Sequence, residues 1–263
     1  MRVKGVIRMT DINTVRQAFA SYEDRRVLVM ISTGAYAHGL ADGNSPREYL
    51  MVVAPTPDEI LYGRASWSDE TAAGITLLTP QVMLERLIAG DLTMLETLSA
   101  PTDLIVYDSG LLHELSVYAM GLGGLHAVVV AQDTVRALLR ALSMADRLGL
   151  SEPRRHALAV EALRLTWSVR RLDRTGVWPC RLDVDDLNRL HEVARAGMPT
   201  SQLVRETEAF SLVPWRTPPA DPASMRAARR VVSATLTRIV NGEHVGTTMP
   251  DALDMFHQWE AMR

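Results

Sequence analysis

The stretch ISTGAYAHGLADGNSPREYLMVVAP, from Ile31 to Pro55, decides how the fold of this chain is interpreted. It contains the end of one apolar run (26–32), a turn with glycines, a short loop and a second apolar run that begins at Glu48. Continuous apolar runs of this length predict strands buried on both faces, since a half-exposed strand alternates apolar and polar residues. The stretch therefore predicts two central strands joined by a turn and a loop.

Weaker signals place other elements around these two strands. A third strand is expected at 74–79, followed by a helix with Pro80 in its first turn, which is a favourable position for proline. Residues 92–101 predict a short helix, and 103–108 predict either a fourth strand or an extended connector. Thr10 or Asp11 can serve as the N-cap of a helix at the beginning of the chain.

Beyond residue 110 the pattern is helical. Apolar positions recur at helical spacing after Asp133, and glycines follow three of the expected helices at positions 149, 176 and 197, where a C-cap glycine is typical. We therefore expect an α+β protein with two parts, a sheet with flanking helices over 1–109 and a helical part over 110–263.

Composition limits the class of protein. The chain has 263 residues, of which 47% are hydrophobic, and no apolar run is long enough to cross a bilayer. A signal-peptide pattern is not seen either, so we expect a soluble cytoplasmic protein without a membrane partner. Cys180 is the only cysteine, which excludes an intramolecular disulfide and favours a buried, inert thiol.

The charge of the chain is nearly balanced, at −3, but its basic residues are almost all arginine. Lys4 is the sole lysine, which disfavours a catalytic lysine. Any phosphate contact from a long cationic side chain is therefore expected to come from arginine. The same bias indicates a GC-rich genome, for which we expect an actinobacterium or one of its phages.

The glycine turn and the loop after it carry a family resemblance. Gly34-Ala35-Tyr36-Ala37-His38-Gly39, followed six residues later by Ser45-Pro46-Arg47-Glu48, resembles a motif pair of nucleotidyltransferases in the DNA polymerase beta superfamily. The likeness is to the bacterial and phage group associated with RNA repair, in which the turn reads Gly-Ser-x-Ala-Tyr-Gly and the next strand opens with Ser-Asp-x-Asp. Gly90, Glu96, Arg164 and the phrase RTGVWP continue it, so that it covers roughly residues 25–210.

The resemblance implies a mixed sheet and a metal-dependent transfer site. In that family, paired aspartates hold two divalent ions, Mg²⁺ or Mn²⁺, and the turn holds the triphosphate. Glu48 is the candidate catalytic residue and metal ligand here. The implied nucleotide-binding positions are Gly34, Ala35, Gly39, Ser45 and Arg164.

This chain departs from the family where the chemistry takes place. Ala35 has no hydroxyl, Pro46 removes a carboxylate, and Glu48 carries its carboxylate on a longer side chain. A third carboxylate is expected at 74–77, where none stands, and Asp69 and Glu70 lie a few residues upstream. The sequence thus predicts that at most one metal ligand of three is retained.

A second candidate surface lies on the expected helix around residue 165. Arg164, Trp167, Arg171 and Arg174 recur at i, i+3, i+7 and i+10, so they share one side of a helix. Arginines with an aromatic residue between them are suited to phosphate and base contacts in RNA. The alternative is a face whose arginines pair with Glu161 and Asp173.

Three functions stay open from the sequence. The first is a nucleotidyltransferase-like protein whose transfer activity is lost or weakened and which binds nucleotide, RNA or a protein partner. The second is an active enzyme that moves a nucleoside monophosphate from an NTP to RNA or protein, with Mg²⁺ or Mn²⁺ as cofactor. The third is a phage-encoded inhibitory protein that uses the fold as a scaffold.

Overall fold

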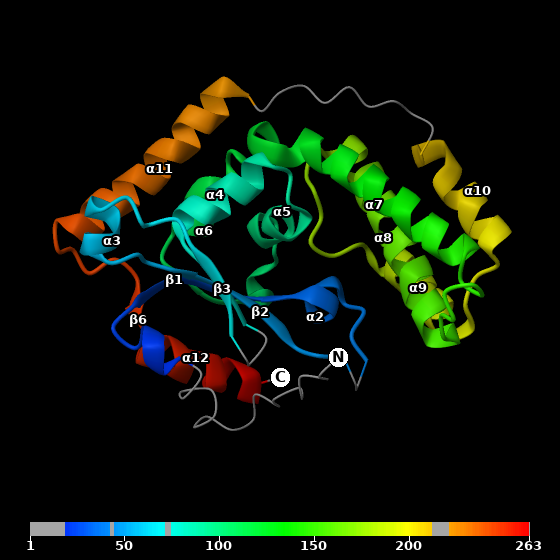
Figure 1. The fold of residues 1–263 in the computed structure, drawn as a ribbon, viewed down its shortest axis with the longest axis horizontal. Helices are drawn as coiled ribbons and strands as arrows, with labels where there is room; N and C mark the ends of the chain where they lie inside the picture. Colours follow the sequence, from blue (N-terminus) through cyan, green and yellow to red (C-terminus); the bar gives the residue numbers. More distant parts are fainter. Residues whose placement is uncertain (1–18, 43–44, 72–74, 212–220, 263) are drawn as a thin grey trace.

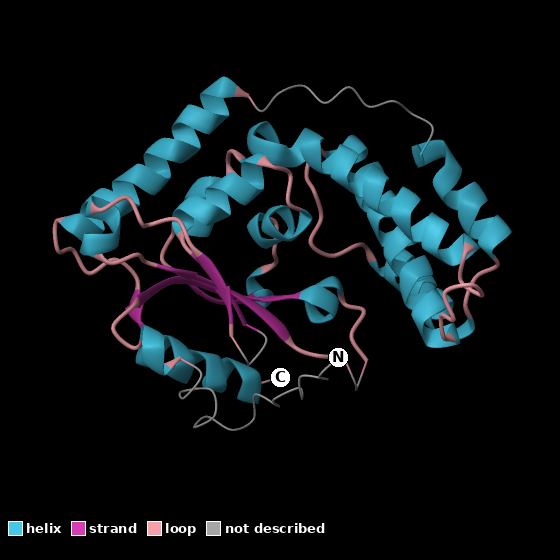
Figure 2. Ribbon diagram, in the orientation of Figure 1, coloured by secondary structure: helices cyan, strands magenta, loops and turns pink. Residues whose placement is uncertain are grey.

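A mixed sheet lies at the centre of the computed structural model, which describes residues 19–42, 45–71, 75–211 and 221–262 (Figures 1 and 2). The central strand β1 (Arg26–Thr33) pairs antiparallel with β2 (Glu48–Val53), and β2 pairs parallel with β4 (Ile75–Leu78). The edge strand β3 (Ser68–Glu70) is antiparallel to β4. On the other side of β1, two short antiparallel strands share its length, β5 (Ile105–Asp108) and β6 (Thr247–Thr248).

Both faces of the sheet are buried, which confirms the interpretation of the two apolar runs. One face, called here the bundle face, packs against most of the helices through Leu28, Ile31, Leu50, Val52 and Leu78. The opposite face packs against the C-terminal helix and Phe19 through Met30, Tyr49, Met51, Val53 and Leu77. Successive side chains on a strand point to opposite faces, so a two-sided core requires an uninterrupted apolar run.

Short α-helices connect the strands of the first part of the chain. They are α2 (Gly34–His38), α3 (Pro57–Leu61), α4 (Pro80–Ile88), α5 (Leu92–Leu98) and α6 (Leu111–Ser116). Pro80 stands in the first turn of α4, as expected, and Asp91 caps α5 by accepting from the Met94 N–H at 3.2 Å.

The longer helices follow a short π-helix at Met120–Gly124. Helices α7 (Leu125–Ser143), α8 (Glu152–Thr175), α9 (Val184–Ala196) and α10 (Thr200–Ser211) form a bundle beside the sheet, whereas α11 (Pro222–Val240) lies across α3, α4 and α6 (Figure 1). The helix expected after Asp133 begins earlier and ends at Ser143. Gly149 therefore ends a series of turns instead of capping that helix, whereas Gly176 and Gly197 are C-caps.

The end of the chain returns to the sheet. Helix α12 (Met249–Ala261) begins at the N-cap Thr248 and covers the face opposite the bundle through Met249, Leu253 and Phe256. Figure 1 shows it below the strands. The predicted division assigned these residues to a helical part over 110–263, and no helix was predicted here. The α+β class and the mixed sheet are as predicted, and 103–108 contains a strand.

The expected N-terminal cap at Thr10 or Asp11 lies outside the described residues. Within the described part of the chain, no helix is both long and apolar enough to cross a bilayer.

The packing of α12 gives a direct test of the two-sided core. Phe256 is fully buried and meets the Tyr49 ring edge-on at 4.8 Å between centroids. We expect Phe256→Ala to lower the free energy of unfolding by about 3–5 kcal/mol, because it removes a large buried side chain and leaves a cavity. Urea denaturation measures this, with Gln258→Ala on the exposed side of the same helix as the control. Equal, small effects of both substitutions would show that α12 does not complete the core.

Candidate functional site

The glycine turn forms where β1 ends on the bundle face. Gly34 (φ +66°) starts the five-residue helix α2, and Gly39 (φ +74°) ends it in the left-handed conformation. Ala35 lies half-buried within α2. Only glycine adopts these backbone angles without strain, so both glycines have a conformational role in the turn. Three predicted nucleotide-binding positions thus lie together on one short segment.

Glu48 contacts this turn directly. It is the first residue of β2 and pairs with Thr33, the last residue of β1. A Cβ atom added to Gly34 would lie 2.8 Å from the Glu48 carboxyl carbon, so the carboxylate rests on the bare Cα of Gly34. A negatively charged group therefore already occupies the side of the turn that a phosphate would approach.

The loop before Glu48 is held by its own hydrogen bonds. The Ser45 hydroxyl donates to Asp42 at 2.8 Å and accepts from the Asp42 N–H at 2.9 Å. The predicted nucleotide-binding residue Ser45 thus closes a local turn, a common use of short polar side chains. Pro46 follows it with an exposed ring.

Arg47 and Tyr49 connect this site to the end of the chain. The Arg47 guanidinium lies 4.8 Å from the centre of the Tyr36 ring and forms an ion pair with Glu260 of α12. The Tyr49 hydroxyl donates to the same carboxylate. Sequence reasoning missed Glu260 altogether. The only available signal was the helical pattern of 249–261, which says nothing about a partner more than 200 residues away.

The position expected for a third carboxylate is occupied by threonine. Thr76 pairs with Leu50 of β2 and faces the bundle side, as Glu48 does. Asp69 and Glu70 lie on the edge strand β3, where Asp69 accepts from the Tyr22 hydroxyl. Among the described residues, no three His, Cys, Asp or Glu side chains come together in a metal-binding arrangement. Glu48 as a metal ligand stays a prediction.

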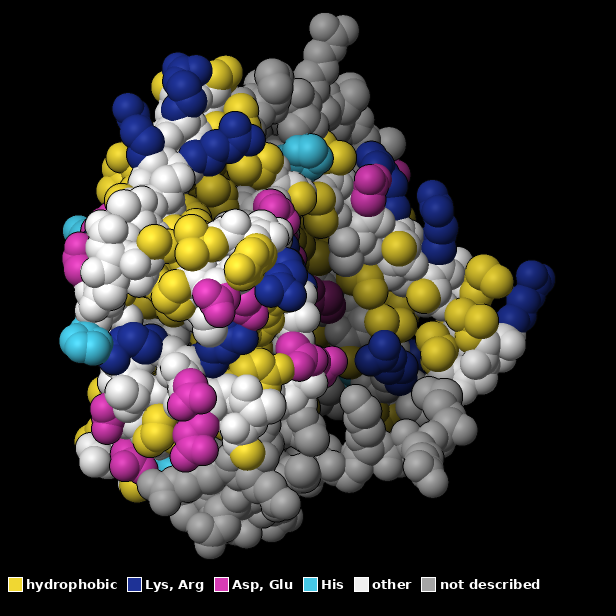
Figure 3. Space-filling view, turned by 60° about the vertical axis from the view of Figure 1, so that its left-hand side comes forward, with side chains coloured by type: hydrophobic (Ala, Val, Ile, Leu, Met, Phe, Trp, Pro, Cys, Tyr) yellow, Lys and Arg dark blue, Asp and Glu magenta, His cyan; other side chains and the backbone are white. Residues whose placement is uncertain are grey.

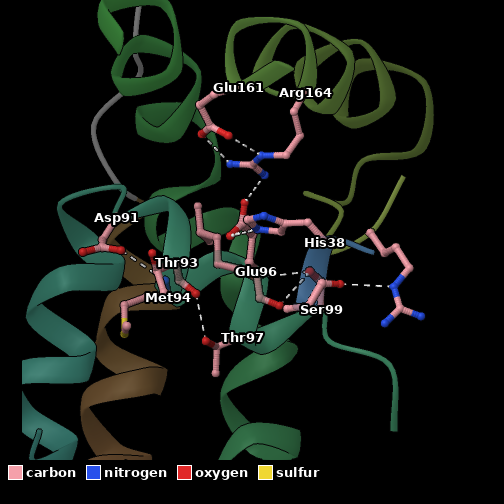
Figure 4. A network of polar contacts seen from close by, with 12 residues as sticks. His38, Asp91, Thr93, Met94, Glu96, Thr97, Ser99, Glu161 and Arg164 are labelled. Atoms are coloured by element: carbon pink, nitrogen blue, oxygen red, sulfur yellow. Dashed lines mark hydrogen bonds and ion pairs between the residues drawn. The ribbon is translucent and has the colours of Figure 1, made fainter. Parts of the chain in front are cut away.

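A buried network of charges supports the turn from behind (Figure 4). Glu96 of α5 forms an ion pair with Arg164 of α8 at 2.6 Å and contacts Nε2 of His38 on α2 at 3.0 Å. Arg164 also binds Glu161 through two parallel contacts of 2.8 Å. The network therefore joins the glycine turn to α5 and α8 through His38.

The electrostatics of this network favour its charged state. Burial alone would raise the pKa of Glu96, but the positive charge of Arg164 and the hydrogen bond from His38 outweigh it and lower this pKa to about 2. The two carboxylates likewise outweigh burial and raise the pKa of Arg164. Because Arg164 is only 5% exposed, it acts as the buried counter-ion of Glu96.

Little space remains between the turn and this network. A cavity lined by Gly34, Ala37, Glu96 and Cys180 has a volume of about 10 Å³, which is close to the minimum for one water molecule. Burial, and then the nearby Glu96 charge, raise the pKa of the Cys180 thiol to about 12, so it stays protonated and unreactive, as predicted. Arg181 closes the same side by donating to the Ala37 carbonyl at 3.1 Å.

The predicted arginine stripe on α8 is divided between the interior and the surface. Arg164 and Trp167 are each only 5% exposed, whereas Arg171 and Arg174 reach solvent. The pairing of Arg164 with Glu161 is the alternative named above, but Arg171 pairs with Asp183 at 2.9 Å instead of Asp173. Two of the four side chains are therefore not displayed at the surface.

Beside the exposed half of the stripe, α8, α9 and α10 enclose a hollow of about 430 Å³. Its lining is balanced in charge, with three arginines and three carboxylates around Trp167: Arg170, Arg174, Arg189, Asp173, Asp186 and Glu206. Arg189 lies over the Trp167 ring at 5.6 Å and pairs with Glu206, and Arg170 donates to the Glu206 carbonyl at 2.8 Å. Arg174 donates to the Arg170 carbonyl at 3.3 Å, so all three arginines are already engaged with groups of the protein.

Comparison with known proteins adds no family assignment. No family model matches the sequence, and no curated protein sequence matches it. The resemblance to nucleotidyltransferases therefore rests on the motif residues described above.

The buried ion pair predicts an asymmetric mutational response. We expect Arg164→Met to lower the free energy of unfolding by about 3–5 kcal/mol, because Glu96 is left buried without its counter-charge. The double variant Glu96→Met, Arg164→Met should recover most of this loss, because it leaves no buried charge unpaired. Urea denaturation of the three proteins measures both effects.

Arg171→Met is the matched control for this series. Its partner Asp183 is half exposed, so its removal should cost less than about 1 kcal/mol. A double variant as unstable as Arg164→Met would show that the loss comes from packing, not from the unpaired carboxylate.

Proposed function

We propose that this protein is a nucleotidyltransferase-like RNA-binding protein whose metal-dependent transfer activity is lost or severely weakened. RNA is its partner in this proposal. The side of the glycine turn that a nucleoside triphosphate would approach is occupied by the Glu48 carboxylate.

The contact between Glu48 and Gly34 carries the proposal. A triphosphate that approached the turn would meet the Glu48 carboxylate first, and two like charges about 4 Å apart repel by about 1 kcal/mol even in water. A transfer site compensates for such charges with two metal ions held by neighbouring carboxylates. Here the position two residues before Glu48 is Pro46, and Arg47 is bound to Glu260.

Three observations favour RNA as the partner. The chain uses arginine for almost all of its positive charge, and arginine binds phosphate through a planar, two-pronged group. Arg174 projects to solvent from α8 beside Trp167 and the hollow described above. The family that the turn motif resembles is itself associated with RNA repair.

An active transferase is the second candidate, favoured by one observation. Glu48 is exposed, and it lies on the same face of the sheet as Thr76 and as the glycine turn. A carboxylate in this position would serve as a metal ligand if further carboxylates approached when substrate bound. The two candidates predict opposite effects of removing the Glu48 charge.

Calorimetric titration with ATP, with and without Mn²⁺, separates them. If Glu48 only obstructs the turn, Glu48→Gln should strengthen metal-free ATP binding by about 1 kcal/mol, roughly fivefold. Mn²⁺ should then change the ATP affinity of the wild type by less than about tenfold. If Glu48 holds a metal, the same variant should weaken ATP binding in the presence of Mn²⁺ by more than about tenfold, which would refute the proposal.

Glu152→Gln is the control, since it removes an exposed carboxylate from the first turn of α8. The RNA part of the proposal is tested separately. Wild-type protein that binds no RNA at low salt would contradict it, whatever the titrations with ATP show.

A further inference from the structure

Helix α11 carries three exposed arginines on one side. Its 19 residues, Pro222–Val240, include four arginines and no aspartate or glutamate. Arg226, Arg229 and Arg230 are exposed, as are Ser233 and Thr237 on the next turns. These five residues follow the spacing i, i+3, i+4, i+7 and i+11, which aligns them along one side of the helix. They are called here the α11 arginine face.

The opposite side of α11 holds the helix in place. Ala228, Val232 and Ile239 are buried, and the helix packs against α3, α4 and α6. Figure 3 turns the part of the molecule that carries α11 toward the viewer. It shows dark-blue side chains, which are lysine or arginine, gathered in the upper part of this view. The arginine face is therefore presented on a fixed helix.

Several arginines described above have an acidic partner. Arg164, Arg171 and Arg189 each have a carboxylate partner within 3.0 Å, and so does Arg238 at the end of α11, which pairs with Glu243. No such pair is formed by Arg226, Arg229 or Arg230 among the described residues. The nearest acidic group along the chain, Asp221, caps the helix by accepting from the Ala223 and Ser224 N–H groups.

We infer that the α11 arginine face binds the phosphodiester backbone of double-stranded RNA. This inference rests on the proposed RNA binding and names its surface. One helical turn of about 5–6 Å separates Arg226 from the neighbouring pair Arg229 and Arg230, a distance at which their side chains reach neighbouring phosphates. The helix contains no aromatic residue on which an unpaired base could stack, so a duplex fits better than a single strand.

The hydroxyl of Ser233 favours RNA over DNA. It lies one turn beyond Arg229 and Arg230 on the same face, within reach of the sugar edge of a bound strand. A ribose 2′-hydroxyl can donate to and accept from such a group, whereas deoxyribose offers none. In this proposal the face contacts phosphates and sugars but not base edges, so binding does not depend on the base sequence.

The test measures binding of a fluorescent RNA duplex of about 16 base pairs by anisotropy, between about 50 and 200 mM salt. The variant Arg226→Gln, Arg229→Gln, Arg230→Gln should bind at least about tenfold more weakly at low salt. Its slope of log affinity against log salt should fall by about 3, one for each lost phosphate contact. Ser233→Ala should reduce the preference for RNA over a DNA duplex of the same sequence.

The control variant Arg154→Gln, Arg195→Gln, Arg205→Gln removes the same charge from exposed positions on α8, α9 and α10. It should bind like the wild type. Circular dichroism should show that both variants fold. The double variant Arg171→Gln, Arg174→Gln tests the competing surface on α8. Loss of duplex binding in this variant, with full binding by the α11 variant, would overturn the inference.

The outcomes separate the two proposals. If the wild type, the α11 variant and the control all bind the RNA duplex with equal affinity, the inference is overturned, but the proposed RNA binding stands. No RNA binding by the wild type would overturn the proposed function itself. Equal binding of RNA duplex, DNA duplex and vesicles of anionic lipid would also overturn the inference, because it would show attraction by charge alone.

Discussion

Burial of β1 on both faces is the constraint on which the rest of the structure depends. A strand with no polar side needs a layer on each face, and a chain that turns helical after the sheet must still supply both. The bundle face is covered by helices that follow the strands directly. The other face is closed by α12, the last helix of the chain, which places Glu260 beside Arg47 and Tyr49. The same requirement for burial therefore also shapes the entrance to the glycine turn.

The ion pair between Glu96 and Arg164 is a second constraint, and it lies on the interior side of the glycine turn. It joins α5, which packs on the bundle face of the sheet, to the centre of α8, and His38 connects it to α2. Two buried charges are costly to remove from water, so they are retained only with close partners on several sides. Because of this cost, Glu96 and Arg164 must keep the arrangement in which their charges are close together. It also assigns Arg164 to support of the turn, whereas the resemblance had implied a contact with nucleotide.

The predictable features of this protein are local. The apolar runs at 26–32 and 48–55 predicted central strands because side-chain alternation is a property of a few neighbouring residues. Gly176 and Gly197 predicted helix ends for the same reason. The spacing of Arg164, Trp167, Arg171 and Arg174 correctly places them on one side of α8, but periodicity does not show which part of that side faces the interior. Glu260 was out of reach, since its partners are distant in the sequence and become neighbours only when α12 covers the sheet.

We propose that the glycine turn beside Glu48 does not transfer nucleotides. The most direct measurement is incorporation of labelled nucleotide from each NTP into RNA and into protein, with Mg²⁺ or Mn²⁺, by wild type and by Glu48→Gln. We expect no incorporation by the wild type above that of the variant. Turnover by the wild type at an ordinary enzymatic rate of about 1 s⁻¹ or more, abolished in Glu48→Gln, would contradict the account and identify Glu48 as a catalytic residue.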